Sequence, residues 1–141
     1  MKPRAGRGAV PKPVAFPIVV GSVVYAPIKA TKGVTKRRPC VVLMATPAVE
    51  DHFIVIGITS DGGNYDPADT RGYPPDLYFP IPSSPDGSSA TGLLRRCAAY
   101  AEFVQDFARS EMAGTAGFVD ATVLNALTAW IRAYIRNQQG R

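Results

Sequence analysis

Two apolar runs of strand length constrain the fold of this chain more than any other feature. Residues 39–46 (PCVVLMAT) and 52–59 (HFIVIGIT) are rich in Val and Ile, and the short connection PAVED separates them. Runs of this length that contain β-branched residues and are bounded by turn residues are typical of buried strands. We therefore predict that the two runs form antiparallel strands joined by a hairpin.

Further strand patterns lie on both sides of this pair. The segments 21–28, 76–82 and 92–107 carry β-branched and aromatic residues, and the last is long enough for one long or two short strands. From Val123 onward, apolar residues recur at helical spacing, with Asp120 in place as an N-cap. Five or six short strands followed by one helix predict a mainly β fold, in which a small, strongly bent antiparallel β-barrel is closed on one side by a C-terminal α-helix.

The composition points to one globular domain. The chain has 141 residues, which is enough for a single core. Residues 1–19 are rich in Gly, Pro and basic residues, and we expect them to form a flexible segment ahead of a single domain over residues 20–138. No apolar run approaches the ~18 residues that span a bilayer, so we expect no membrane partner.

Cysteine and histidine usage narrows the chemistry. Cys40 and Cys97 lie within predicted strands and indicate buried thiols of a cytoplasmic protein rather than a disulfide. The chain has a single histidine and no metal-ligand spacing. The sequence therefore predicts no metal site and no cofactor.

The positive charge is concentrated in two segments. Residues 1–12 hold four basic and no acidic side chains, and residues 29–38 hold five basic and no acidic ones. The rest of the chain holds seven basic and eleven acidic residues, a net charge of −4. Such clustering is typical of proteins with a phosphate-rich partner. The alternative is that a tail and a loop carry these charges as ordinary solvated surface.

The motifs, taken in order, resemble a known family. They are GSVVYAPI (21–28), RRPCVVLM (37–44), FIVIGITSDGGN (53–64) and TGLLRRC (91–97). In this order they resemble the PemK/MazF-like toxins of type II toxin–antitoxin modules, over a stretch from Gly21 to Ile135. The resemblance implies an SH3-like β-barrel that forms a homodimer. It also implies a metal-independent endoribonuclease that cleaves single-stranded RNA and is neutralised by a cognate antitoxin.

The same resemblance implies a set of site residues. Arg38, directly before a proline, matches the arginine that points into the RNA groove, and Thr59 matches the threonine near the scissile phosphate. Thr91 and Arg95 match further active-site positions of one branch, with Arg96 as the alternative to Arg95 if the register shifts by one. Four further residues are expected to bind the substrate together with Arg96; they are Lys32, Lys36, Arg37 and Ser60.

Cleavage in this family uses the 2′-hydroxyl of the RNA as nucleophile, so the protein supplies charge stabilisation at the phosphate and proton transfer at two oxygens. The branch with the TSDGGN loop is assigned a histidine in the first loop and an aspartate after the arginine of the fourth motif. Here Lys32 lies near the first of these positions, and Cys97, or Ala98 in the shifted register, occupies the second.

Other interpretations of these residues remain. Arg38 also fits a solvated charge at a strand entry, and Thr59 and Thr91 fit ordinary strand-end and turn chemistry. A second function is a non-catalytic barrel of the same fold that binds nucleic acid or inhibits a DNA-processing enzyme such as gyrase. The absent histidine and aspartate favour this second function, whereas the pair of Arg38 and Thr59 beside a basic loop favours the nuclease. A third option is a purely structural adaptor.

Overall fold

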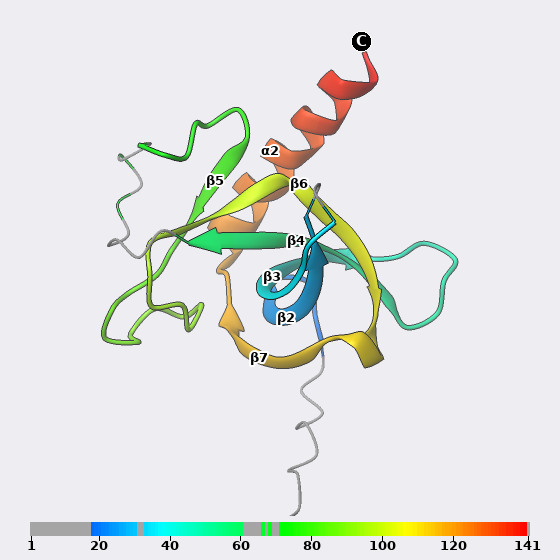
Figure 1. Cartoon of the computed structure of the whole chain (residues 1–141), viewed down its shortest axis with the longest axis horizontal. Helices are drawn as coiled ribbons and strands as arrows, with labels where there is room; N and C mark the ends of the chain where they lie inside the picture. The colour runs from blue at the N-terminus through cyan, green and yellow to red at the C-terminus, as the bar shows by residue number, and fades with distance from the viewer. Residues whose placement is uncertain (1–17, 31–32, 61–65, 67, 69–70, 141) are drawn as a thin grey trace, which may run out of the picture.

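One antiparallel sheet and one helix make up the computed structural model of the chain (Figure 1). The structure describes residues 18–30, 33–60, 66, 68 and 71–140. The strands are, in chain order, β2 (Ser22–Lys29), β3 (Thr35–Ala45), β4 (His52–Ser60), β5 (Tyr78–Ile81), β6 (Cys97–Ala108) and β7 (Ala113–Phe118). The 3-10 turn η1 (Arg109–Glu111) links β6 to β7, and helix α2 (Ala121–Gln139) follows β7.

The described strands are joined in the order β5-β6-β4-β3-β2-β7, and each neighbouring pair is antiparallel. The sheet curls until β2 and β6 meet, although two strands lie between them in this order. There the Gln105 side chain donates to the Lys29 carbonyl at 2.8 Å and accepts from the Lys29 N–H at 3.1 Å. The sheet is therefore a half-barrel, which confirms the predicted mainly β fold with a C-terminal helix.

Side-chain alternation gives the sheet two apolar faces. One face, called the helix face below, includes Val23, Val41 and Ile56 and packs against α2, where Leu127 and Ile131 are buried. The other, called the inner face, lies inside the curl. Its buried residues are Val24, Ala26, Ile28, Cys40, Val42, Val55, Phe103 and Phe107. Because both faces are apolar, the central strands are nearly continuous hydrophobic runs in the sequence.

Helix α2 begins at the predicted cap. The Asp120 side chain accepts a hydrogen bond from the Val123 N–H at 2.9 Å, an interaction that typically contributes about 1 kcal/mol. The Trp130 indole N–H donates to the Pro75 carbonyl at 2.8 Å and fastens the helix to the segment before β5. Within the described part of the chain, no helix is both long and apolar enough to cross a membrane.

Two boundaries differ from the prediction. Strand β3 begins at Thr35 rather than at Pro39, because its pairing with β2 continues to Lys29↔Thr35. Lys36, Arg37 and Arg38 therefore belong to a strand, and their placement in a loop was wrong. Strand β6 is one strand that begins only at Cys97.

Strand β7 was not predicted. Its sequence AGTAGF has two glycines and no apolar alternation, and it is held as a strand by its pairing with β2. Cys40 and Cys97 are buried free thiols, as expected. The expectation of a flexible segment over residues 1–19 falls almost wholly on residues 1–17, which lie outside the described residues.

Candidate functional site

A pocket of about 330 Å³ opens where strands β3 and β4 separate. Their pairing ends at Cys40↔Gly57, beyond which β3 continues beside β2 and β4 continues beside β6. Pro39 has no N–H with which to extend the ladder. The described residues that line the pocket are Tyr25, Lys36, Arg37, Arg38, Pro39, Ile58, Ser60, Gly92, Leu93, Leu94, Arg95 and Cys97. Five of the nine predicted site residues are thus brought together at one place.

The charge of this pocket is one-sided. Its described lining contains Lys36, Arg37, Arg38 and Arg95 and neither Asp nor Glu. Among the described residues, no ion pair neutralises any of these four side chains. A concave site lined by unpaired cations concentrates positive potential and attracts anions.

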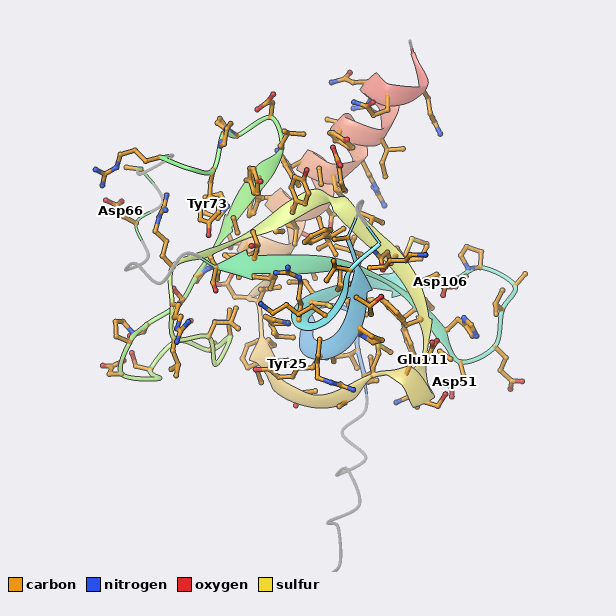
Figure 2. All side chains as sticks on the ribbon, in the orientation of Figure 1. Tyr25, Asp51, Asp66, Tyr73, Asp106 and Glu111 are labelled. Atoms are coloured by element: carbon orange, nitrogen blue, oxygen red, sulfur yellow. The ribbon has the colours of Figure 1, made fainter. Side chains whose placement is uncertain are left out.

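Asp51 and Asp106 lie at the opposite end of the β4–β6 strand pair from the pocket, whereas Glu102 is exposed in the middle of β6. Asp51 immediately precedes β4 and Asp106 pairs near its start, whereas the pocket residue Ser60 ends it. Figure 2 shows Asp51, Asp106 and Glu111 gathered at that far end, away from Tyr25. His52 also lies there, with its Nδ1 3.0 Å from an Asp106 carboxylate oxygen. The single histidine of the chain is therefore not part of the pocket.

Arg38 is held in place from the inner face of the sheet. Its guanidinium lies over the Phe103 ring, 5.2 Å from the centroid. Gly57 leaves room for that ring, because a Cβ at Gly57 would lie 3.0 Å from the Phe103 Cβ. The Arg38 Nε–H is buried without a hydrogen-bond acceptor among the described residues. Such an unsatisfied donor is rare in folded proteins and is often found at functional sites.

Thr59 lies two residues beyond the last pair of the β3–β4 ladder and does not line the pocket. Because Cys40 pairs with Gly57, alternation places Arg38 and Thr59 on the same inner face, each two residues past that pair. The Thr59 side chain is half-buried, and its carbonyl accepts a weak hydrogen bond of 3.5 Å from the Tyr73 hydroxyl. By the same alternation, the pocket residues Arg37 and Ser60 point to the helix face. The predicted residues therefore flank the two strand ends on both faces.

Thr91 lies behind the pocket rather than in its lining. The side chain is buried, and its hydroxyl donates to the Pro82 carbonyl at 2.7 Å and accepts from the Leu93 N–H at 3.2 Å. These bonds fix the loop that carries Gly92, Leu93 and Leu94 onto the pocket wall. The structure thus assigns Thr91 a positioning contact with that loop.

Gly92 is required where this loop crosses β7. Its φ is +72°, and a Cβ there would lie 2.1 Å from the Ala116 carbonyl oxygen. The contact is reciprocal, because a Cβ at Gly117 would lie 2.1 Å from the Ala90 carbonyl oxygen. The close backbone approach seats the loop, and with it Arg95, at the mouth of the pocket.

Of the two adjacent arginines, Arg95 lines the pocket and Arg96 does not. Arg96 is buried, donates to the Arg71 carbonyl at 2.8 Å and places its guanidinium 4.5 Å from the centroid of the Tyr73 ring. It therefore anchors the segment before β5. Lys32, the remaining predicted binding residue, lies outside the described residues.

The two positions at which the resemblance led us to look for an aspartate, Cys97 and Ala98, hold no acid. Cys97 lines the pocket but is only 3% exposed, and its Sγ donates to the Ile81 carbonyl at 3.6 Å. Ala98 is fully buried. The described residues form no group of three or more His, Cys, Asp or Glu side chains that could hold a metal ion.

Cys40 is not a nucleophile either. Burial raises the pKa of its thiol to about 12, although a backbone hydrogen bond at Ala26 and the charge of Arg38 act in the opposite direction. The reactive form of cysteine is the thiolate. Cys40 therefore serves as a packing residue directly beneath Arg38, to whose carbonyl its Sγ donates at 3.3 Å.

Sequence reasoning missed the apolar side of the pocket. Tyr25, Ile58, Leu93 and Leu94 were taken as strand residues without a role in the site. The only sequence pattern that could have pointed to one of these residues is side-chain alternation, which places Tyr25 on the same face of the sheet as Val23. Their convergence depends on contacts between segments far apart in the chain.

No family model matches this chain, and no curated protein matches it. Among solved structures, the chain is similar to one in the crystal structure of MazE-MazF (Form-III) from Deinococcus radiodurans. The alignment covers 89% of this chain and 98% of that chain, at 20% sequence identity and a TM-score of 0.49.

Proposed function

We propose that this protein is the toxin of a type II toxin–antitoxin module and acts as a metal-independent endoribonuclease on single-stranded RNA. The observation that carries this proposal is the pocket between the ends of β3 and β4, whose described lining has four basic side chains and no acidic one. A phosphate backbone is the natural ligand of such a site, since guanidinium groups bind phosphate oxygens through paired hydrogen bonds.

Arg38 and Thr59 share the inner face at the ends of the two strands, which suggests where the scissile phosphate binds. We expect a phosphate between the two strand ends to contact Arg38 from one strand and the Thr59 hydroxyl from the other. Arg37 and Ser60, on the helix face, and the loop residue Arg95 would flank it. When the 2′-oxygen of the RNA attacks phosphorus, negative charge grows on the phosphoryl oxygens. Cations already held at the site stabilise that charge without reorganisation.

The same pocket offers a means of control. A cognate antitoxin would silence the enzyme by placing an acidic segment across the basic residues that otherwise bind RNA. We further propose a homodimer, in which two such pockets act on one RNA strand.

A second function has support from one observation. The described lining of the pocket contains no His, Asp or Glu, so no conventional acid–base pair is present there. This favours a non-catalytic barrel that binds nucleic acid or blocks a DNA-processing enzyme. Binding and cleavage need to be measured separately for this reason.

The test uses antitoxin-free protein, a long single-stranded RNA and excess EDTA. We expect discrete fragments with 5′-hydroxyl ends from the wild type and none from Arg38→Ala. Arg132→Ala, which removes an exposed arginine of α2 remote from the pocket, is the matched control and should cleave normally. RNA that is retained but intact would support the non-catalytic binder. RNA that is neither cut nor bound would overturn the nuclease and the RNA binder, and would leave inhibition of a DNA-processing enzyme as the function to test.

A further inference from the structure

The proposed reaction lacks an evident proton donor. Breaking the bond from phosphorus to the 5′-oxygen leaves an alkoxide, and a positioned acid accelerates this step. The described lining offers no His, Asp or Glu. Arginine side chains hold their proton too tightly to transfer it. Four other described residues of the lining carry a proton on oxygen, sulfur or nitrogen; they are Tyr25, Lys36, Ser60 and Cys97.

Three of these are poorly placed or poorly suited. The Cys97 thiol is buried and already donates to a backbone carbonyl. Ser60 is an ordinary exposed alcohol at the end of β4. Lys36 is exposed near the start of β3 on a long flexible stem, and alternation points it to the inner face, on the opposite side of the strand from Arg37. The Ser60 hydroxyl is far less acidic than a phenol, the Lys36 side chain is not fixed by the sheet, and the Cys97 thiol is not free. None of the three therefore combines a side chain fixed by the sheet with a free, readily ionised proton.

Tyr25 meets both conditions. It lies in the middle of β2, paired with Pro39 on one side and with Ala113 of β7 on the other, so its backbone is fixed by both neighbouring strands. The next residue of β2 pairs with Arg38. Alternation places the Tyr25 ring on the helix face, the same face as Arg37 and Ser60.

The Tyr25 side chain is also available. It is half-buried and lines the pocket, and its hydroxyl makes no hydrogen bond to any residue that the structure describes. Figure 2 shows Tyr25 near the junction of β2 and β7. A phenol hydroxyl both donates and accepts hydrogen bonds. A residue of this kind, surrounded by phosphate-binding cations, would meet an RNA backbone at the phosphate.

We propose that Tyr25 is the general acid of the reaction, an inference that rests on the proposed ribonuclease function. As the 2′-oxygen forms its bond to phosphorus, its proton passes to solvent water and the bond from phosphorus to the 5′-oxygen breaks. The Tyr25 hydroxyl gives its proton to that 5′-oxygen, and the phenolate then takes a proton from water. The products are a 2′,3′-cyclic phosphate and a 5′-hydroxyl.

The decisive variant is Tyr25→Phe, which removes only the hydroxyl and keeps the ring against Pro39. We expect RNA cleavage to fall by about 100-fold or more, the usual contribution of a general acid. Binding of a 2′-deoxy oligonucleotide, which cannot be cut, should stay unchanged. Tyr134→Phe, a matched loss of a tyrosine hydroxyl on α2 outside the pocket, should cleave like the wild type.

A second substrate separates proton donation from a structural role. In RNA with sulfur in place of the scissile 5′-oxygen, the leaving thiolate needs no acid. Tyr25→Phe should therefore cleave this substrate at nearly the wild-type rate. If Tyr25→Phe cleaves both substrates slowly, or cleaves ordinary RNA at the wild-type rate, Tyr25 is not the general acid. In either case, cleavage by the wild type would still support the proposed ribonuclease function. A wild-type protein that cuts neither substrate would overturn the ribonuclease function itself.

Discussion

Replacing the basic pocket residues one at a time should lower the salt dependence of RNA binding in equal steps. Each cation that contacts a phosphate of a single strand adds about 0.7 to the slope of log affinity against log salt, because bound counterions are released. The pocket holds Lys36, Arg37, Arg38 and Arg95. Four contacts then contribute a slope of about −2.8, and each alanine variant should bring it about 0.7 closer to zero.

The effect is large enough to measure. Between 50 and 200 mM KCl, a slope of about −2.8 weakens binding roughly 50-fold, and a slope of about −2.1 weakens it roughly 18-fold. Fluorescence anisotropy of a labelled 2′-deoxy oligonucleotide gives both values without cleavage. The basic residues at 1–12 are the same in the wild type and in every variant. Their contribution to the slope therefore cancels when the slopes are compared.

The control is again Arg132→Ala, which should leave the slope unchanged because Arg132 lies on the exposed side of α2. If all pocket variants keep the wild-type slope, the pocket does not bind the RNA backbone, and the electrostatic reasoning behind the site is wrong. The reasoning would also be wrong if Arg132→Ala changed the slope of log affinity against log salt as much as Arg37→Ala does.

Two further predictions concern stability. Gly92→Ala should lower the free energy of unfolding in urea by well over 2 kcal/mol, because it adds a backbone clash to the left-handed φ. Gly72→Ala, with φ +76° and no described atom within 4 Å of its Cβ, should cost only about 1 kcal/mol; equal losses would contradict the clash. For Cys40, whose pKa rises from 9.0 to about 12 on burial, the folded state keeps a proton that the unfolded state loses above pH 9. The wild type should therefore lose about 1.4 kcal/mol per pH unit relative to Cys40→Val between pH 9 and 11, and a constant difference would contradict this.

Several elements could be predicted because their causes are local. The Val- and Ile-rich runs of β3 and β4 can bury both faces only as central strands, and the sequence alone identifies them. Asp120 signals the start of α2 because a cap acts within its own turn. The order of the motifs pointed to Arg38 and Thr59, which lie on the same face of the sheet just past the last pair of the ladder.

Other elements depend on contacts that no local pattern encodes. Strand β7 has little strand propensity and exists because β2 offers it an edge to pair with. The early start of β3 follows from its pairing with Lys29 rather than from its own residues. Arg95 and Arg96 look alike in the sequence, and only the packing of Arg96 on Tyr73 separates their roles.

The sequence by itself therefore determined the central strands, the terminal helix and the basic character of the segment before Pro39. The tertiary structure decided that β3 and β4 separate beyond Gly57, that the loop at Gly92 closes the gap, and that Tyr25 joins the arginines there. The physical reason is that hydrophobic periodicity and capping act over a few residues. A pocket, by contrast, is formed by strand register and by close backbone contacts between segments dozens of residues apart.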